Sequence, residues 1–132
     1  MGMPAAKEGD LVIAVDIHIV LIPAPPGPPI PTPLPNPFNG IINQGLSSNV
    51  KINGMAAATV NSIANNTPPH IPVGGPFQKP PTNKGEIITG SLSVKINGKM
   101  AARAGDTAMT CNDPTDMPIG TVVAVSNVLV GG

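Results

Sequence analysis

The sequence of 132 residues has no Trp, no Tyr, only 2 Phe and a single Cys. Because Cys111 has no second cysteine to pair with, an internal disulfide cannot stabilise the fold. With so few aromatic side chains, the core has to be built from Val, Ile, Leu, Met and Ala. We therefore expect a thin core.

Charged residues are also scarce, at 11% of the chain, and the formal net charge is zero. There is no basic excess, no Lys/Arg cluster and no aromatic platform, which excludes a nucleic-acid-binding surface. The N-terminus MGMPAAKEGD lacks a charged segment followed by an apolar one, so we expect no secretory signal peptide. Residues 11–22 are apolar except for Asp16 and His18, and they are too few to form a membrane-spanning helix.

Proline and glycine are abundant, with 18 Pro and 15 Gly. Such a composition can indicate a disordered chain, but the hydrophobic fraction of 41% and the β-branched runs argue against disorder. Residues 23–37, PAPPGPPIPTPLPNP, are the densest in proline. Proline has no N–H to donate and fixes φ, so this segment predicts an extended, polyproline-like arm and a rigid connector, neither a helix nor a central strand.

A recurring phrase organises the chain. Residues 94–106 read VKINGKMAARAGD and residues 50–62 read VKINGMAAATVNS. A third copy is split between the termini, with VLVGG at 128–132 and PAAKEGD at 4–10. The first two copies are separated by one third of the chain length, which predicts three packed units with pseudo-threefold symmetry and neighbouring termini.

The local pattern indicates β-structure. Residues 11–22 are rich in β-branched side chains, and their alternation puts Asp16 and His18 on one face of a strand. The two Asn-Gly pairs at 53–54 and 97–98 predict tight hairpin turns. The expected fold is an all-β, small pseudo-threefold cone of short β-strands and hairpins with Pro-rich connectors. We expect little helix, at most a turn or two around residues 55–64.

Each unit is followed by one residue that can bind a metal ion: His18, His70 and Cys111, which are the only His and Cys residues of the chain. Taken singly, a histidine on a strand is usually structural, and a buried cysteine behaves as a small hydrophobe. One donor per unit at similar places favours a metal site, because a threefold arrangement would bring the three together. Imidazole and thiolate are the usual zinc ligands, and iron also accepts them.

The repeat phrase, the N-terminal MPAAKEGD, PPHIP at 68–72 and TCNDP at 110–114 resemble the PAAR-repeat proteins, which cap the spike of contractile injection systems. The segments look most like a PAAR-like tip protein of phage-tail-like particles, and the resemblance covers nearly the whole chain. It implies a cone of β-strands seated on a trimeric, VgrG-like β-helical spike. It also implies a zinc or iron ion held by His and Cys near the point.

Carried over to this sequence, the resemblance makes His18, His70 and Cys111 ligands of one transition-metal ion, zinc in preference to iron. The usual set of three His and one Cys would place another His where this chain has Asn36. The fourth ligand is then Asn36 or a water molecule.

Three ligands and an open position also describe catalytic zinc sites. The available general bases are only Asp16 and Asp113, and the chain has no Ser/His/Asp arrangement or phosphate-binding loop. We therefore expect no enzyme activity, with a small metal-dependent hydrolase as a remote alternative.

The expected partner is a VgrG-like trimer, capped by one copy of this chain through the repeated strands. The candidate contact residues are Val50, Ile52, Val94, Ile96, Val128 and Val130. Because the connectors differ most between units, they should gather at the metal end, away from the spike.

The chain is expected to be one domain, 1–132, without an effector extension, although effectors can travel with such a tip. It would be cytoplasmic during assembly and then sit at the tip of the particle, meeting a membrane only transiently during puncture. The alternative is a metal-stabilised β scaffold or binding module unrelated to injection, whose Pro-rich arm binds a partner's aromatic groove.

Overall fold

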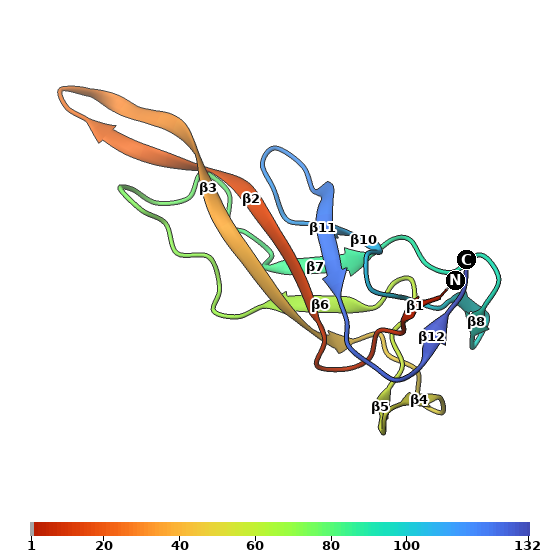
Figure 1. Ribbon diagram of the computed structural model, residues 1–132. Coiled ribbons are helices and arrows are strands. Elements are labelled where there is room, and N and C mark those ends of the chain that lie inside the picture. The colour runs from red at the N-terminus through yellow and green to blue at the C-terminus, as the bar shows by residue number, and fades with distance from the viewer. Residues whose placement is uncertain (1) are drawn as a thin grey trace.

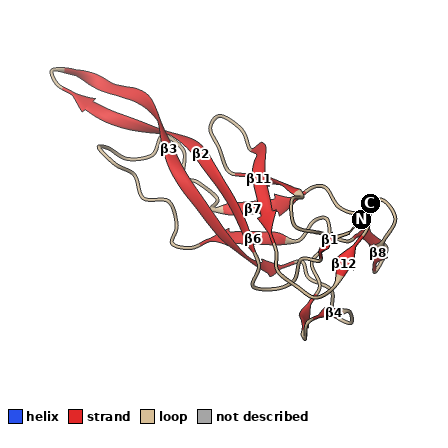
Figure 2. Ribbon diagram, in the orientation of Figure 1, coloured by secondary structure: helices blue, strands red, loops and turns tan. Residues whose placement is uncertain are grey.

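The computed structural model describes residues 2–132, and this range contains strands but no helix (Figure 2). The predicted all-β class is confirmed, while the turn or two of helix expected around residues 55–64 is wrong. The strands are β1 (Met3–Pro4), β2 (Leu11–Ala24), β3 (Gly27–Gln44), β4 (Lys51–Ile52), β5 (Met55–Ala56), β6 (Ile63–Asn66), β7 (Lys84–Ile87), β8 (Lys95–Ile96), β9 (Lys99–Met100), β10 (Thr107–Thr110), β11 (Met117–Val123) and β12 (Leu129–Val130). None of the described residues forms a helix long and apolar enough to cross a membrane.

Six strands close into a barrel in the order β10-β11-β2-β3-β6-β7. Its longest hairpin, β2–β3, projects far beyond the other strands and forms the narrow end of the molecule (Figure 1). The short hairpins β4–β5 and β8–β9 lie at the opposite, wide end, together with the paired strands β1 and β12. The expected neighbouring termini are present, because Met3 pairs with Val130.

The structure corrects the expectation for residues 23–37, which are not a separate polyproline connector. Most of them belong to β3, which pairs with β2 in continuous antiparallel register from Ile41 opposite Leu11 to Ile30 opposite Ile22. The prolines are tolerated because this part of β3 pairs with β2 alone, and a strand bonded on one side needs only every second N–H. β6 joins β3 only from Gly40 onward.

A ring of three backbone hydrogen bonds lies on the pseudo-threefold axis. The N–H of Ala6 donates to the carbonyl of Ala102 at 2.9 Å, Ala58 donates to Ala6 at 3.0 Å, and Ala102 donates to Ala58 at 3.1 Å. Each of the three is the last residue of the alanine run in its repeat unit and is buried. Because the alanine side chain is a single methyl group, the three backbone segments can approach closely enough to close this ring.

The turn after each alanine pair is built in the same way three times. A side chain accepts a backbone N–H three residues earlier, and the donor and acceptor pairs are Lys7 to Asp10, Thr59 to Ser62 and Arg103 to Asp106. The residue before each acceptor has a positive φ, at 92° for Gly9, 78° for Asn61 and 90° for Gly105. Asn-Ser can therefore replace Gly-Asp, because Asn tolerates this conformation and Ser can accept the bond.

The core consists of two clusters, as expected largely from small aliphatic side chains. One fills the barrel around Phe38, Ile42 and Ile87; the other lies between the three units at the wide end. Phe38 is the one aromatic residue of the barrel cluster. A Cβ at Gly40 would lie 2.6 Å from the Phe38 ring, so the glycine makes room for the ring.

Candidate metal centre

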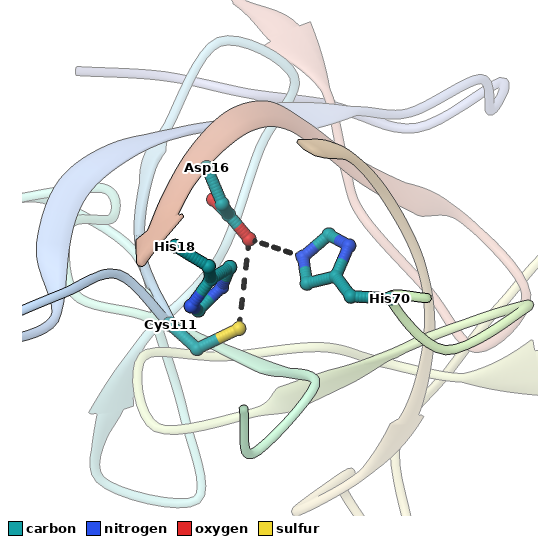
Figure 3. Close-up of side chains that lie close together, drawn as sticks. All are labelled: Asp16, His18, His70 and Cys111. Carbon is teal, nitrogen blue, oxygen red and sulfur yellow. Dashed lines mark hydrogen bonds and ion pairs between the residues drawn. The ribbon is translucent and has the colours of Figure 1, made fainter. Parts of the chain in front are cut away.

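Four buried side chains bring their donor atoms together inside the narrow half of the barrel: Asp16, His18, His70 and Cys111. All four donor atoms lie within 4.8 Å of one another. Figure 3 shows the side chains converging from separate parts of the chain. Two come from β2, His70 from the connector between β6 and β7, and Cys111 from the residue after β10. The structure thus brings together the three donors predicted from the sequence.

The alternation along β2 positions Asp16 and His18. Both are fully buried, whereas Val15 is 58% exposed and Ile17 38% exposed on the opposite face. This is the arrangement that the sequence predicts, since successive strand residues point to opposite faces. His70 is fixed through its backbone, whose N–H donates to Oδ1 of Asn83 at 2.8 Å.

The carboxylate of Asp16 is hydrogen-bonded to two other members of the cluster and to two neighbouring side chains. Its Oδ1 accepts a bond from the Thr110 hydroxyl at 2.6 Å and from the Asn112 amide at 3.3 Å. Its Oδ2 lies 2.8 Å from Nε2 of His70, and the Cys111 thiol donates to the same oxygen at 3.5 Å (Figure 3). Such a set of donors explains how a carboxylate can be buried here, because an unpaired one would be very costly.

The hydrogen bonds of Asn66 determine the tautomer of His70. Oδ1 of Asn66 accepts the backbone N–H of Asn39 at 2.9 Å, so its amide nitrogen faces Nδ1 of His70 at 3.2 Å. Nδ1 is then the acceptor, and Nε2 carries the proton that bonds to Asp16. Ligation of a metal through Nε2 would move the ring proton to Nδ1 and would require the Asn66 amide to turn.

His18 is the residue whose environment is incomplete. Within the described chain, both of its ring nitrogens are buried without a hydrogen-bond partner, and so is Oδ1 of Asp113. Nδ1 of His18 lies 3.6 Å from that oxygen, too far for a hydrogen bond. Burial lowers the pKa of His18, and the negative charge of Asp113 opposes this shift only in part. A neutral imidazole with an unused Nε2 lone pair is what a metal ion needs.

Cys111 is held as a thiol in the absence of metal. Burial, reinforced by the negative charge of Asp16, raises its pKa to about 11. A thiolate in this place therefore requires a positive partner. A bound cation would supply that charge and displace the thiol proton.

The four residues fit a tetrahedral ion in number and in chemistry. Zinc bonds of about 2.0–2.3 Å to N, O and S place neighbouring ligand atoms about 3.3–3.8 Å apart. The donor atoms lie 2.8 Å apart between Asp16 and His70 and at most 4.8 Å apart within the cluster, and these two distances bracket this range. Two imidazoles, a thiolate and a carboxylate suit zinc and iron alike, so the donor set does not distinguish between them.

Asn36, the fourth position considered from the sequence, lies directly opposite Asp16 in the β2–β3 register. Its amide donates to the carbonyl of Leu34 at 3.0 Å, and its side chain lines a surface cavity together with His70. Asp16, which the sequence suggested only as a general base, supplies a fourth donor atom to the cluster. The alternation that paired Asp16 with His18 on one face was the signal that could have identified it.

Asp113, the other candidate base, fastens its connector to β2. Its Oδ2 accepts the N–H of Ile19 at 2.8 Å, and its own N–H donates to the carbonyl of Ile17 at 2.8 Å. The next residue toward the cluster, Asn112, accepts the N–H of Ile17 at 2.7 Å. These bonds hold Cys111 next to His18.

The predicted partner-binding residues divide into two groups. Ile52, Ile96 and Val130 are at most 9% exposed and pack together in the core of the wide end, which leaves little of these side chains for a partner to contact. Val94 and Val128 are exposed by 37% and 41%, and Val50 is partly buried. The division follows the position within the repeat, because residues 52, 96 and 130 end the short strands β4, β8 and β12, whereas residues 50, 94 and 128 lie just before them.

The family model described as PAAR motif matches residues 78–132. This segment carries a PAAR motif. The matched range is less than half of the chain; it contains the repeat unit at 94–106 and Cys111 but not Asp16, His18 or His70. No curated protein matches the sequence. The PAAR motif confirms the resemblance drawn from the repeat phrases and points to the spike tip of a contractile injection system, where PAAR proteins are structural components and not enzymes.

Proposed function

We propose that this chain caps a trimeric, VgrG-like spike, one copy per trimer, and sharpens it for puncture of a target envelope. The observation that carries the proposal is the ring of hydrogen bonds joining Ala6, Ala58 and Ala102 in a chain that also carries a PAAR motif. A monomer with three equivalent units can offer the same contact to each of three identical subunits. An asymmetric fold would match only one subunit at a time.

The wide end of the molecule is the proposed contact surface. It carries the short hairpins and the paired strands β1 and β12, and it lies opposite the β2–β3 tip (Figure 1). Its exposed apolar side chains are Met3, Met55, Leu92, Val94, Val128 and Leu129. A specific joint would bury about 1,000 Å² or more in total, which is at the small end for stable complexes.

The proposed metal ligands are Asp16, His18, His70 and Cys111, with Asp16 in the place that sequence reasoning left to Asn36 or water. One transition-metal ion, zinc in preference to iron, would cross-link β2 to two connectors, and structural zinc sites contribute about 10 kcal/mol or more to folding. The barrel core is built largely from small aliphatic side chains. The residues of the cluster would therefore hold the connectors against the hairpin when force is applied to the tip.

This proposal treats residues 1–132 as one domain of three units that works at the tip of a particle. It would be assembled in the cytoplasm and would meet a membrane only during puncture, with effectors as additional passengers. The competing function, a β scaffold unconnected with injection, shares the fold and the metal site. It differs in requiring no trimeric partner.

The test is co-purification with candidate spike trimers, read by light scattering and negative-stain imaging. The expected complex has one copy of this chain at the blunt end of each trimer. The double variant Val94→Asp/Val128→Asp should lose capping, because an unpaired charge buried in a joint is costly. Ile30→Asp, at an exposed apolar position of the hairpin tip, is the matched control and should still cap. Capping by the folded double variant combined with loss of capping by Ile30→Asp would show that the orientation is inverted.

A further inference from the structure

The outer edge of β3 has an unusual supply of hydrogen-bonding groups. Between Gly27 and Asn39 this strand pairs with β2 on one side, and its other side has no strand partner within the described chain. We call the backbone groups of residues 31–39 on that other side the free edge. In Figure 1 the hairpin projects away from the barrel. The inner part of the free edge, from Pro35 to Asn39, borders a cavity shared with connector residues 66–73, and the outer part lies beyond this cavity toward the hairpin tip.

The bonds made by β2 show which backbone groups of β3 point outward. The N–H groups of Ile17, Ile19 and Leu21 donate to Asn112, Asp113 and Pro76, away from β3. These β2 residues therefore form non-hydrogen-bonded pairs with their β3 partners, which are Pro35, Pro33 and Pro31. In such a pair the backbone N and C=O of both residues point away from the partner strand. The same alternation applies to Pro37, opposite Val15.

Every outward backbone position of the free edge thus lacks an available donor. Pro31, Pro33, Pro35 and Pro37 have no N–H. The next outward residue, Asn39, already donates its N–H to Oδ1 of Asn66 at 2.9 Å. The outward carbonyls of the prolines remain, so the free edge can accept hydrogen bonds but cannot donate any.

The surroundings of the free edge make protection necessary. The outward face of β2 exposes Ile13, Val15 and Ile17, and the hairpin tip exposes Ile30 at 56%. The only charged residue between Leu11 and Gln44 is Asp16, which is buried. Edge strands are commonly protected by charged side chains, and an exposed apolar edge without them favours association. This hairpin has none of those charges.

We infer that the alternating prolines of β3 prevent the hairpin from adding another strand, above all β3 of a second copy of this chain. Two free edges brought together would present carbonyl to carbonyl and could form no ladder hydrogen bond. A foreign strand could donate to the free edge but would receive nothing in return, leaving half of its ladder unmade. The proline pattern thus keeps the projecting tip monomeric, a property that depends on neither the metal site nor the spike contact.

The test restores the missing donors. Thr has a high β propensity and an N–H, so Pro31→Thr/Pro33→Thr/Pro35→Thr supplies three outward donors without adding charge or apolar surface. Pro80→Thr/Pro81→Thr, in the connector before β7, is the control for a general loss of proline. Sedimentation velocity over a range of concentrations, on protein shown to be folded by circular dichroism, measures the oligomeric state.

The natural chain and the control should remain monomeric, while the triple variant should at least double its mass as concentration rises. Amide hydrogen exchange should then show the new N–H groups at 31, 33 and 35 protected only in the associated species. A folded triple variant that stays monomeric at its solubility limit, with these amides exchanging freely, would overturn the inference. If three changes prevent folding, Pro33→Thr alone, at the middle of the free edge, gives the same readouts.

Discussion

Oδ2 of Asp16 lies 2.8 Å from Nε2 of His70, although 54 residues separate them in the chain. Both side chains are almost completely buried, and this contact fastens the long connector between β6 and β7 to the middle of β2. The same two atoms belong to the cluster proposed to bind metal. A bound ion would replace this contact, because Asp16 and His70 would then be ligands of the ion and no longer partners of each other.

Asp16→Asn should lower metal affinity and stability together. The amide is a poor metal ligand. It also has only one acceptor oxygen, whereas the two carboxylate oxygens of Asp16 accept hydrogen bonds from Thr110, Asn112, His70 and Cys111. Leaving one of these buried donors unpaired should cost about 1–3 kcal/mol of unfolding free energy even in chelator. Competition against a colorimetric chelator and urea titration measure the two effects. Asp116→Asn, at an exposed position, should change neither.

Asn36→His should restore metal binding to Asp16→Ala. The two positions face each other across β2 and β3, and the side chain at 36 already borders the cavity next to His70. Imidazole is a far better zinc donor than a carboxamide, so the double variant would again have four donors. Affinity is measured in the single and double variants by the same competition. If the added histidine gives no recovery while the protein is folded, position 36 does not reach the ion.

Protein purified without chelator should contain close to one equivalent of zinc or iron, measured by plasma emission spectrometry. Cys111→Ser should reduce this content, because a serine hydroxyl does not ionise as a thiol does. Its thermal stability should fall below that of the natural chain when metal is present and approach it after chelation. Absence of both metals from the natural protein would exclude a native metal site in this cluster.

The Cys111 thiol should react slowly with iodoacetamide in chelated, folded protein at neutral pH. Its pKa of about 11 leaves little thiolate, and the side chain is only 2% exposed. The folded state holds this proton more tightly than the unfolded state, whose thiol has an ordinary pKa near 9.0. The resulting stability is complete below that value and is lost as the pH rises to about 11. Urea titrations across this interval should show the loss, and the same series on Cys111→Ser should lack it.

Ala58→Leu should destabilise the whole fold, because it forces extra methyl groups into the ring of Ala6, Ala58 and Ala102. Ala58 is 1% exposed, and overpacking a tight core typically costs about 1–3 kcal/mol. Ala24→Leu, near the hairpin tip, is the control and should be close to neutral. Urea denaturation measures both. A neutral Ala58→Leu would show that the axis tolerates separation of the three units.

The sequence by itself determined the repeat, the all-β class and the two faces of β2. These follow from local rules, since alternation places Asp16 with His18 and each Asn-Gly pair specifies a turn. The repeat also indicated which chain segments are equivalent, including the unit split between the termini. The alanine ring agrees with this division of the chain, because each unit contributes one of its three alanines.

Only the tertiary structure decided how the proline-rich segment pairs, that Asp16 joins the cluster, and which side chains of the repeated phrase are buried. A proline-rich segment excludes a strand bonded on both sides, yet it permits one bonded on a single side, and which case holds depends on the register with β2. Asp16 enters the cluster because the connectors of β6 and β10 pass over β2, an arrangement set by contacts between residues far apart in sequence. Ile52 is buried and Val94 exposed although both belong to the same repeated phrase, because the three units share one small core that only one side chain of each strand can enter.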